Sequence, residues 1–383
     1  MAERKFPWKW VVIGGGALLL VALVVGYLTA MRTVVQAYYR AEYQPAELSA
    51  AELVDGPANF RLTDVTWYSE PVPLGATVSL RMLAAQQGRV EPRSVIDFWT
   101  GATWGATPIP QRTGFFPGQD AEPGLLRGAT ALGFTRRYLT TDDRALFVKA
   151  LKHFLAKGRA VRVAVDRAML LEQSGLVPHS LVLVGYEGDR FEYYEPWCDE
   201  PARCAHALER EPGTAGLHVP AERLALACES LALALQYPWK YQLVVLEKDP
   251  AAPAPALEKT LQQNGSALVG SKGRGPSLGV PLVESVAKAL DTHGEGVVTP
   301  ELLRGVKTAA AVRRDDAEAL LLLFPGRTEL AKTAEALDSA AKLYGEAATA
   351  LEAKQLEAGV RALRAAAQAD QRAGEAILVL PSR

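Results

Sequence analysis

The residues that could do chemistry lie in one hairpin-like stretch. Ser180–Tyr186 is an apolar, β-branched run that predicts a buried strand, and a Glu-Gly-Asp turn separates it from a second predicted strand, Arg190–Glu195. His179 precedes the first strand and Glu195 ends the second. Antiparallel pairing would bring these two side chains together. A histidine oriented by a carboxylate is the general-base half of a nucleophilic site, whereas each residue alone is an ordinary polar strand end.

This stretch resembles the papain-like cysteine peptidase superfamily, in particular the branch of bacteriocin-processing peptidases and butirosin-type acyltransferases. The shared features are a His, an apolar strand ending in Gly-Tyr, a turn, and an aromatic strand ending in an acid followed by Pro. The resemblance implies that His179 is the general base. It also implies that Glu195 replaces the family's orienting Asp, with a side chain that is one methylene longer.

The same resemblance places the nucleophile at the start of a helix predicted over Thr77–Gln87. A cysteine stands there in the family, where the helix dipole and free backbone amides lower a thiol pKa. Matching the Ser-Leu-Arg-Met segment to the family pattern puts Gly75 at the cysteine position. Glu70 then stands near the family's oxyanion-binding Gln, and a carboxylate there opposes acyl transfer. No cysteine precedes Cys198, so the resemblance implies a site without its thiol.

Two hydroxyls on this helix offer a substitute nucleophile. Thr77 or Ser79 could act with His179 and Glu195 as base and orienter. Their ordinary roles would be a helix cap and a hydroxyl on the helix surface.

A loop rich in Gly, Thr and Trp follows a short helix predicted over Pro92–Trp99. Its aromatic side chains could line a groove for a peptide or acyl ligand. They could equally form the packed lid of a small core, and the sequence favours neither interpretation. The residues concerned are Trp99, Trp104, Phe115 and Phe116.

The amino terminus contains a run of twenty uncharged residues, Val11–Ala30, which is long enough to cross a bilayer as a helix. Basic residues are more numerous before the run than directly after it, which predicts a cytoplasmic amino terminus. We therefore expect a single-pass membrane protein with its bulk outside the cytoplasm, in the periplasm of a bacterium. A cleaved signal peptide is the alternative, but the run is long for one and Leu28-Thr29-Ala30 is a poor cleavage site.

Three cysteines follow the hairpin strands. Cys198 and Cys204 share a polar loop, and in an oxidising compartment they could form a disulfide. Cys204 and His206 could instead bind a metal, but their spacing matches no zinc pattern, so we predict neither a metal site nor a cofactor. Cys228 lies in an apolar helical stretch and is expected to be a buried free thiol.

Composition and linkers divide the rest of the chain. The 383 residues carry a net charge of −1, which gives no bulk argument for nucleic-acid binding. Residues 249–256, DPAAPAPA, form a stiff linker. Apolar periodicity beyond it predicts a helical bundle, which could also mediate oligomerisation. The predicted helices are Leu257–Leu268, Pro281–His293, Pro300–Phe324, Arg327–Lys354 and Leu356–Leu378.

We therefore expect an α+β protein in which a papain-like domain, a helix packed on an antiparallel sheet, lies between a transmembrane helix and a helical bundle. The expected parts are a cytoplasmic tip and anchor (1–31), a juxtamembrane linker (32–58), the papain-like domain (59–248), the Pro/Ala linker (249–256) and the helical domain (257–383).

Three functions are open at this point. The first is an inactive pseudoenzyme that binds a peptide, acyl or amide ligand, or a protein partner, in its cleft. The second is a hydrolase or acyltransferase with a nucleophile other than Cys. The third is a scaffold that oligomerises through its helices. The missing thiol favours the first.

Overall fold

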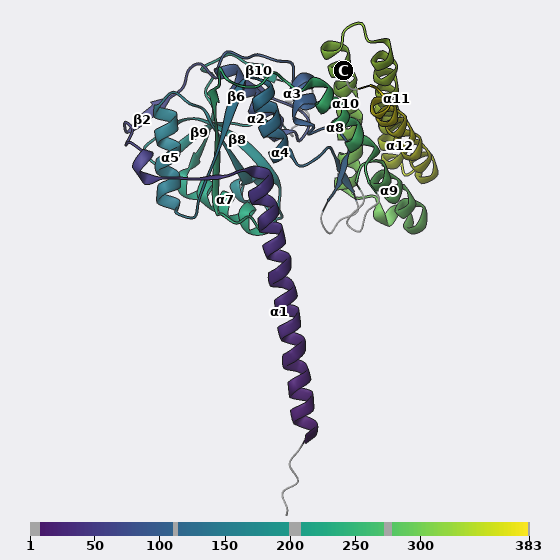
Figure 1. The fold of residues 1–383 in the computed structure, drawn as a ribbon, viewed down its shortest axis with the longest axis horizontal. Coiled ribbons are helices and arrows are strands. Elements are labelled where there is room, and N and C mark those ends of the chain that lie inside the picture. Colours follow the sequence, from purple (N-terminus) through teal and green to yellow (C-terminus); the bar gives the residue numbers. More distant parts are fainter. Residues whose placement is uncertain (1–7, 110–113, 199–207, 272–277, 382–383) are drawn as a thin grey trace, which may run out of the picture.

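The computed structural model describes the chain except for residues 1–7, 110–113, 199–207, 272–277 and 382–383. It shows an α+β protein with three parts (Figure 1): a long amino-terminal helix, a sheet with surrounding helices, and a carboxy-terminal group of helices. We call residues 46–248 the sheet region and residues 257–378 the helical region.

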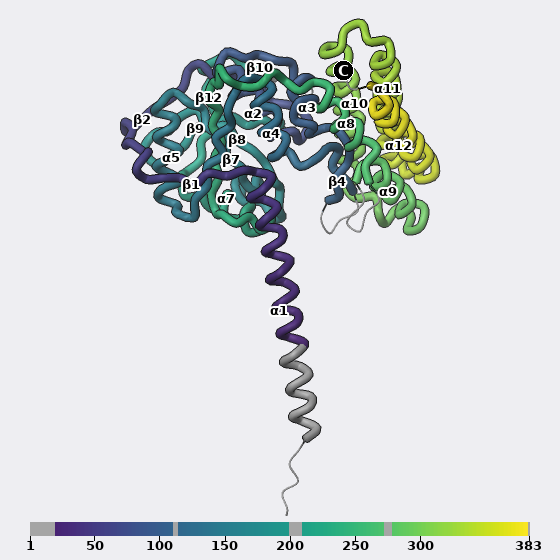
Figure 2. Tube along the Cα trace, viewed as in Figure 1, coloured from purple at the N-terminus to yellow at the C-terminus, as the bar shows by residue number. Residues whose placement is uncertain are grey.

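The amino-terminal helix α1, Trp8–Tyr43, projects from the body as a stalk (Figures 1 and 2). Its described stretch Leu20–Tyr43 is long and apolar enough to cross a membrane, and its apolar window is not buried by the rest of the chain. The helix continues without a break well past Ala30. The juxtamembrane segment therefore begins as a rigid extension of the apolar helix.

One mixed sheet forms the centre of the sheet region. Its strands follow the order β1-β6-β12-β7-β8-β9-β11, with β2 paired to β8, and every pairing is antiparallel except β1 with β6. The strands are β1 (Ala46–Glu47), β2 (Asn59–Arg61), β6 (Phe134–Thr141), β7 (Val161–Asp166), β8 (Pro178–Glu187), β9 (Arg190–Tyr194), β11 (Leu217–Pro220) and β12 (Tyr241–Lys248).

Helices cover this sheet because each buries an apolar stripe. α2 packs on β7 and β8 and also contacts α4, whereas α5 and α7 contact each other and both contact β7 and β12. The helices are α2 (Gly75–Gln86), α3 (Arg93–Thr100), α4 (Ala121–Ala131), α5 (Arg144–Ala156), α6 (Arg167–Leu170) and α7 (Ala221–Leu235). The Asp143 carboxylate caps α5, because it accepts hydrogen bonds from the first amides of that helix.

Two short two-stranded sheets complete this region. β3 (Trp67–Ser69) pairs with β10 (Leu208–Arg210), and β4 (Ala106–Pro108) pairs with β5 (Phe115–Pro117). The chain over residues 59–69 forms two separate strands, because β2 pairs with β8 and β3 pairs with β10.

The helical region contains the five predicted helices, each within two residues of its expected ends. α10, α11 and α12 pack along one another, and α10 also packs on α3 and β5. The helices are α8 (Leu257–Val269), α9 (Val280–His293), α10 (Pro300–Leu323), α11 (Thr328–Glu352) and α12 (Leu356–Leu378). The linker thus joins two regions that share a buried interface.

A buried guanidinium joins these two regions. Arg313 of α10 donates to the backbone oxygens of Thr103 (2.6 Å) and Gly105 (2.9 Å) in the sheet region. It also contacts Asp316 of α10 (3.0 Å) and Asp370 of α12 (2.7 Å). Because every one of these groups is removed from water, losing one would leave the others unpaired.

The interface also buries three of the four aromatic residues considered for a ligand groove, whereas Phe116 is 43% exposed. Trp99, Trp104 and Phe115 are 7%, 0% and 1% exposed. Trp99 and Trp104 share a core with α8 and α10, and the Phe115 ring contacts Tyr344 of α11. These three side chains therefore pack the interface with the helical region rather than line an open groove, since that region covers them.

Candidate functional site

The hairpin of β8 and β9 brings His179 and Glu195 together. The strands pair antiparallel with a bulge between Leu183 and Gly185, which sets the register at the open end of the hairpin. There, Nε2 of His179 contacts Oε1 of Glu195, and both side chains are largely buried. The same Glu195 oxygen accepts a hydrogen bond from the backbone amide of Trp197 at 3.0 Å. The longer acid thus still reaches and orients the imidazole.

Gly75, the first residue of α2, lies against the other side of the imidazole. A Cβ atom built on Gly75 would lie 3.0 Å from both Nδ1 and Cε1 of His179, and 3.4 Å from the amide nitrogen of Ser180. A side chain at this position would therefore face the ring nitrogen opposite the one that Glu195 contacts. This is the order of groups needed for nucleophile, base and orienter, but glycine supplies no nucleophilic atom.

The two α2 hydroxyls considered as nucleophiles are both buried. The Thr77 hydroxyl donates to the backbone oxygen of Leu74 at 3.1 Å, and its side chain is 1% exposed. Ser79 is fully buried, and its hydroxyl has no hydrogen-bond partner among the described residues. Within that part of the chain, neither hydroxyl bonds to His179.

Glu70 lies beside this site but points into an ion cluster. Its backbone pairs with the segment after Glu195, through the oxygen of Pro196 and the amide of Cys198, each at 2.9 Å. Its buried carboxylate lies between Arg81 (3.7 Å) and Arg93 (3.9 Å). Burial raises the pKa of Glu70, and the two guanidinium groups oppose that rise.

The ion cluster extends into the helical region. Arg93 of α3 contacts Asp97 on the next turn (3.8 Å) and Asp315 of α10. Burial raises the pKa of Asp97 to about 8, although Arg93 favours its charged form. The position expected to bind an oxyanion is therefore linked through Arg93 to the helical region.

Trp197 lies beside the imidazole and two arginines approach the Trp197 ring, and the sequence singled out none of these three residues. The Trp197 ring lies 6.0 Å from the His179 ring. The Arg167 guanidinium lies 4.8 Å from the Trp197 ring and also approaches Glu195, with 3.5 Å between Nε and Oε2. Arg304 of α10 approaches the same indole at 5.8 Å. The Glu-Pro-Trp order could have indicated Trp197, but the arginines come from distant segments.

The neighbouring acid Asp166 holds the local backbone. It accepts hydrogen bonds from the amides of Ala168 and Val177, each at 3.0 Å, and from the Ser230 hydroxyl at 2.7 Å. It therefore caps α6 and holds the turn before β8.

Two of the three cysteines, Cys198 and Cys228, lie in the part of the chain that the structure describes. Cys198 is disulfide-bonded, whereas its predicted partner Cys204 and the metal candidate His206 lie outside the described residues. Cys228 is a buried free thiol, as expected, and burial raises its pKa. Among the described residues, no group of His, Cys, Asp and Glu could hold a metal ion.

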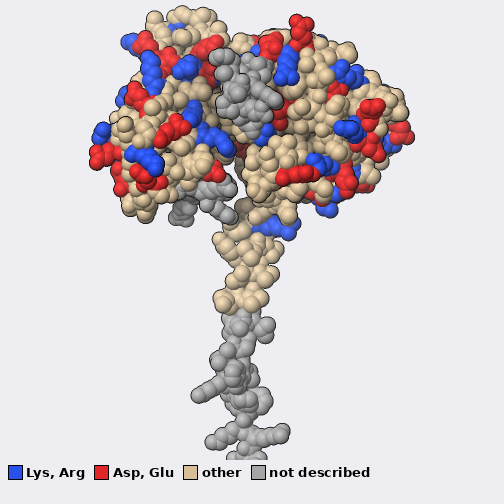
Figure 3. Space-filling model, turned by 180° about the vertical axis from the view of Figure 1, so that it is seen from behind, with Lys and Arg blue, Asp and Glu red and all other residues tan. Residues whose placement is uncertain are grey.

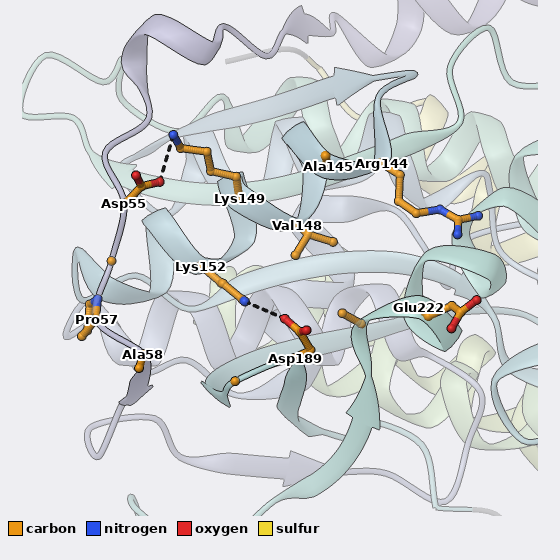
Figure 4. Close-up of a pocket in the computed structure, with 13 residues that line it drawn as sticks. Asp55, Pro57, Ala58, Arg144, Ala145, Val148, Lys149, Lys152, Asp189 and Glu222 are labelled. Carbon is orange, nitrogen blue, oxygen red and sulfur yellow. Dashed lines mark hydrogen bonds and ion pairs between the residues drawn. The ribbon is translucent and has the colours of Figure 1, made fainter.

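A groove of about 850 Å³ lies on another part of the sheet region (Figure 4). It runs between the residue 55–58 segment, α5 and the turn between β8 and β9. Ion pairs on its walls join Lys149 to Asp55 (2.9 Å) and Lys152 to Asp189 (3.1 Å), as the dashed lines show. None of the predicted site residues lines it, so we assign it no chemistry.

Comparisons of the chain with profiles of known protein families and with curated proteins found no match.

Proposed function

We propose that this protein is a membrane-anchored, papain-like pseudoenzyme that uses the remnant of a cysteine-peptidase site to bind a peptide or acyl ligand or a protein partner. The observation that carries this proposal is the place of Gly75. A side chain there would start 3.0 Å from Nδ1 of His179, while Nε2 of the same ring contacts Glu195. The base and its orienter are assembled around a residue that cannot attack a substrate.

Glu70 supports the same conclusion independently. Oxyanion stabilisation needs donors aimed at the developing negative charge. Glu70 instead offers a carboxylate, and that group is held by Arg81 and Arg93. Nucleophile and oxyanion donor are thus both replaced, whereas the base is kept.

The two alternatives have less support. An enzyme that uses Thr77 or Ser79 would need a hydroxyl beside His179, but the Thr77 hydroxyl bonds to Leu74 and that of Ser79 is fully buried. A scaffold made only of the helical region would need that region to act alone. Its buried contacts with the sheet region, centred on Arg313, favour a single functional unit.

The proposed location is a cytoplasmic membrane, with the amino terminus in the cytoplasm and the bulk in the periplasm of a bacterium. α1 is long and apolar enough to serve as the anchor. The disulfide at Cys198 fits an oxidising compartment.

Hydrolysis assays on the full-length protein in detergent test whether the protein lacks hydrolytic activity. Peptide, ester and thioester substrates would be compared for the wild type, for His179→Ala, and for His218→Ala as a control at an exposed histidine of β11. We expect no turnover that depends on His179. Turnover that His179→Ala abolishes and His218→Ala preserves would overturn the pseudoenzyme, and labelling of Thr77 or Ser79 by an acyl-reactive reagent would identify the nucleophile.

A further inference from the structure

An exposed apolar side chain stands beside the stalk. Leu233, near the end of α7, is 82% exposed. Figure 1 shows α7 at the end of the body from which α1 projects. A crevice of about 970 Å³ separates the two, with Tyr27, Leu28 and Met31 of α1 on one wall and Leu233 on the other. An exposed leucine is ordinary by itself, but its place relative to the anchor is informative.

The sequence of α1 fixes where a bilayer would end. The uncharged run continues through Met31, and Arg32 is the first charge after it. At 1.5 Å per residue, residues 31–36 cover about 9 Å of helix, comparable to the headgroup layer on one side of a bilayer. The crevice spans α1 from Tyr27 to Gln36. Its opposite wall therefore lies at the level of the headgroups.

The body is held firmly at this level. The Tyr39 hydroxyl of α1 donates to the backbone oxygen of Leu235 at the end of α7, at 2.8 Å. The rings of Tyr39 and Tyr237 meet edge to face at 4.6 Å, and Tyr43 packs near Trp239 at 6.2 Å. A helix that continues rigidly from the membrane and is packed in this way cannot let the body swing freely away from the surface.

We propose that the end of α7 and the loop after it, residues 233–240, form a membrane-resting face that sits in the outer headgroup layer. This inference rests on the proposed anchoring by α1. Leu233 enters the boundary between headgroups and acyl chains, where an apolar side chain is stabilised. Behind it, Tyr237 is half-buried and Trp239 is buried, so these rings support the face from within the body.

The charges around the crevice indicate which lipid surface it fits. Arg32 and Lys240 line it together with Asp142 and Glu229. Both signs are present, so the face fits a zwitterionic headgroup layer and needs no excess of anionic lipid. On the side shown in Figure 3, the described part of the stalk below the body is free of charged side chains, as a lipid-facing surface requires.

The test is a depth measurement on the full chain in phosphatidylcholine nanodiscs. An environment-sensitive NBD fluorophore would be attached at Leu233→Cys. A second variant, Leu23→Cys, reports on the anchor, since Leu23 is an exposed residue of α1. A third, Val379→Cys, is the matched control: Val379 is 79% exposed but lies next to the carboxy-terminal end, far from the stalk in Figure 1.

We expect blue-shifted emission and quenching by shallow spin-labelled lipids at position 233, quenching by deep spin labels at position 23, and neither at position 379. Quenching at 23 combined with water-like emission at 233 would overturn the membrane-resting face while leaving the anchor intact. Water-like emission at both 23 and 233 would overturn the anchor and the face together. Adding phosphatidylglycerol, an anionic lipid, should leave the depth of the fluorophore at position 233 unchanged. If the fluorophore entered the headgroup layer only when phosphatidylglycerol was present, the proposed fit to a zwitterionic surface would be overturned.

Discussion

A Cβ atom on Gly75 would lie 3.0 Å from Nδ1 of His179, closer than most side chains pack. Gly75 opens α2 and His179 opens the buried part of β8, so the two meet where helix and sheet pack together. His179 keeps its contact with Glu195 although nothing nucleophilic stands on its other side.

Replacing Gly75 with Cys should create a reactive thiol. The imidazole would need to give way by a few tenths of an ångström and could then hold a thiolate as an ion pair, which lowers a thiol pKa below its usual value of about 8.5. We expect Gly75→Cys to react with iodoacetamide at mildly acidic pH, whereas the wild type, with Cys228 buried, does not. Gly75→Cys/His179→Ala should lose this reactivity at acidic pH. Equal rates in the two variants would contradict the placement of His179.

Replacing Arg313 with Leu should strongly destabilise the protein. Asp316 and Asp370 would remain buried without their cation, a loss of about 3–5 kcal/mol. Thermal unfolding in detergent would show a clearly lower midpoint. Arg314→Leu is the matched control, because Arg314 is exposed on the same helix, and it should change stability by no more than about 0.5 kcal/mol. Similar midpoints for the two variants would argue against the Arg313 network.

Ionisation of the buried Asp97 carboxyl should make the protein less stable as the pH rises. Its folded pKa is about 8, mainly because of burial, whereas an unfolded Asp has a pKa of about 3.9. The folded state therefore binds the proton more tightly, and stability falls as pH rises from about 4 to about 8. Arg93, Asp315 and Asp316 act on the same group, with Arg93 opposing the shift.

The Asp97→Asn substitution removes this titrating carboxyl. We expect a flatter dependence of the unfolding midpoint on pH and a gain of stability at pH 8 of the order of a few kcal/mol. The measurement is thermal unfolding from pH 5 to pH 8 for both proteins. A steeper dependence in the variant, or a loss of stability confined to pH 8, would show that Asp97 is charged in the folded protein.

Trp104→Ala should act on stability rather than on a ligand. The side chain is completely buried between the two regions, and its removal leaves a cavity that costs about 3–5 kcal/mol. Phe116→Ala, on the adjacent β5 strand with a 43% exposed ring, should have a far smaller effect. Denaturant unfolding distinguishes the two. A Trp104→Ala protein of normal stability would instead favour the interpretation that Trp104 lines a ligand groove.

Local sequence determined the elements with strong patterns. α12 has the predicted bounds and α8 ends one residue later than predicted, because long apolar periodicity and clear ends leave little choice. The approach of His179 to Glu195 was also predicted, since a hairpin brings the ends of two adjacent strands together. Short strands such as β4, β5, β10 and β11 were missed because three or four residues cannot show a period.

Only the tertiary structure decided which distant groups meet. The sequence aligned Gly75 with a nucleophile position through resemblance, but packing of α2 on β8 placed it against His179. The sequence indicated no ion-pair partner for Glu70. In the structure Glu70 pairs with Arg93, which also pairs with Asp315 of α10. The sequence also left open whether Trp99, Trp104 and Phe115 line a groove or pack in a core, and the helical region buries all three. The periodic spacing of apolar residues predicts which of them are buried. Which element covers a buried residue depends on how separate elements pack together.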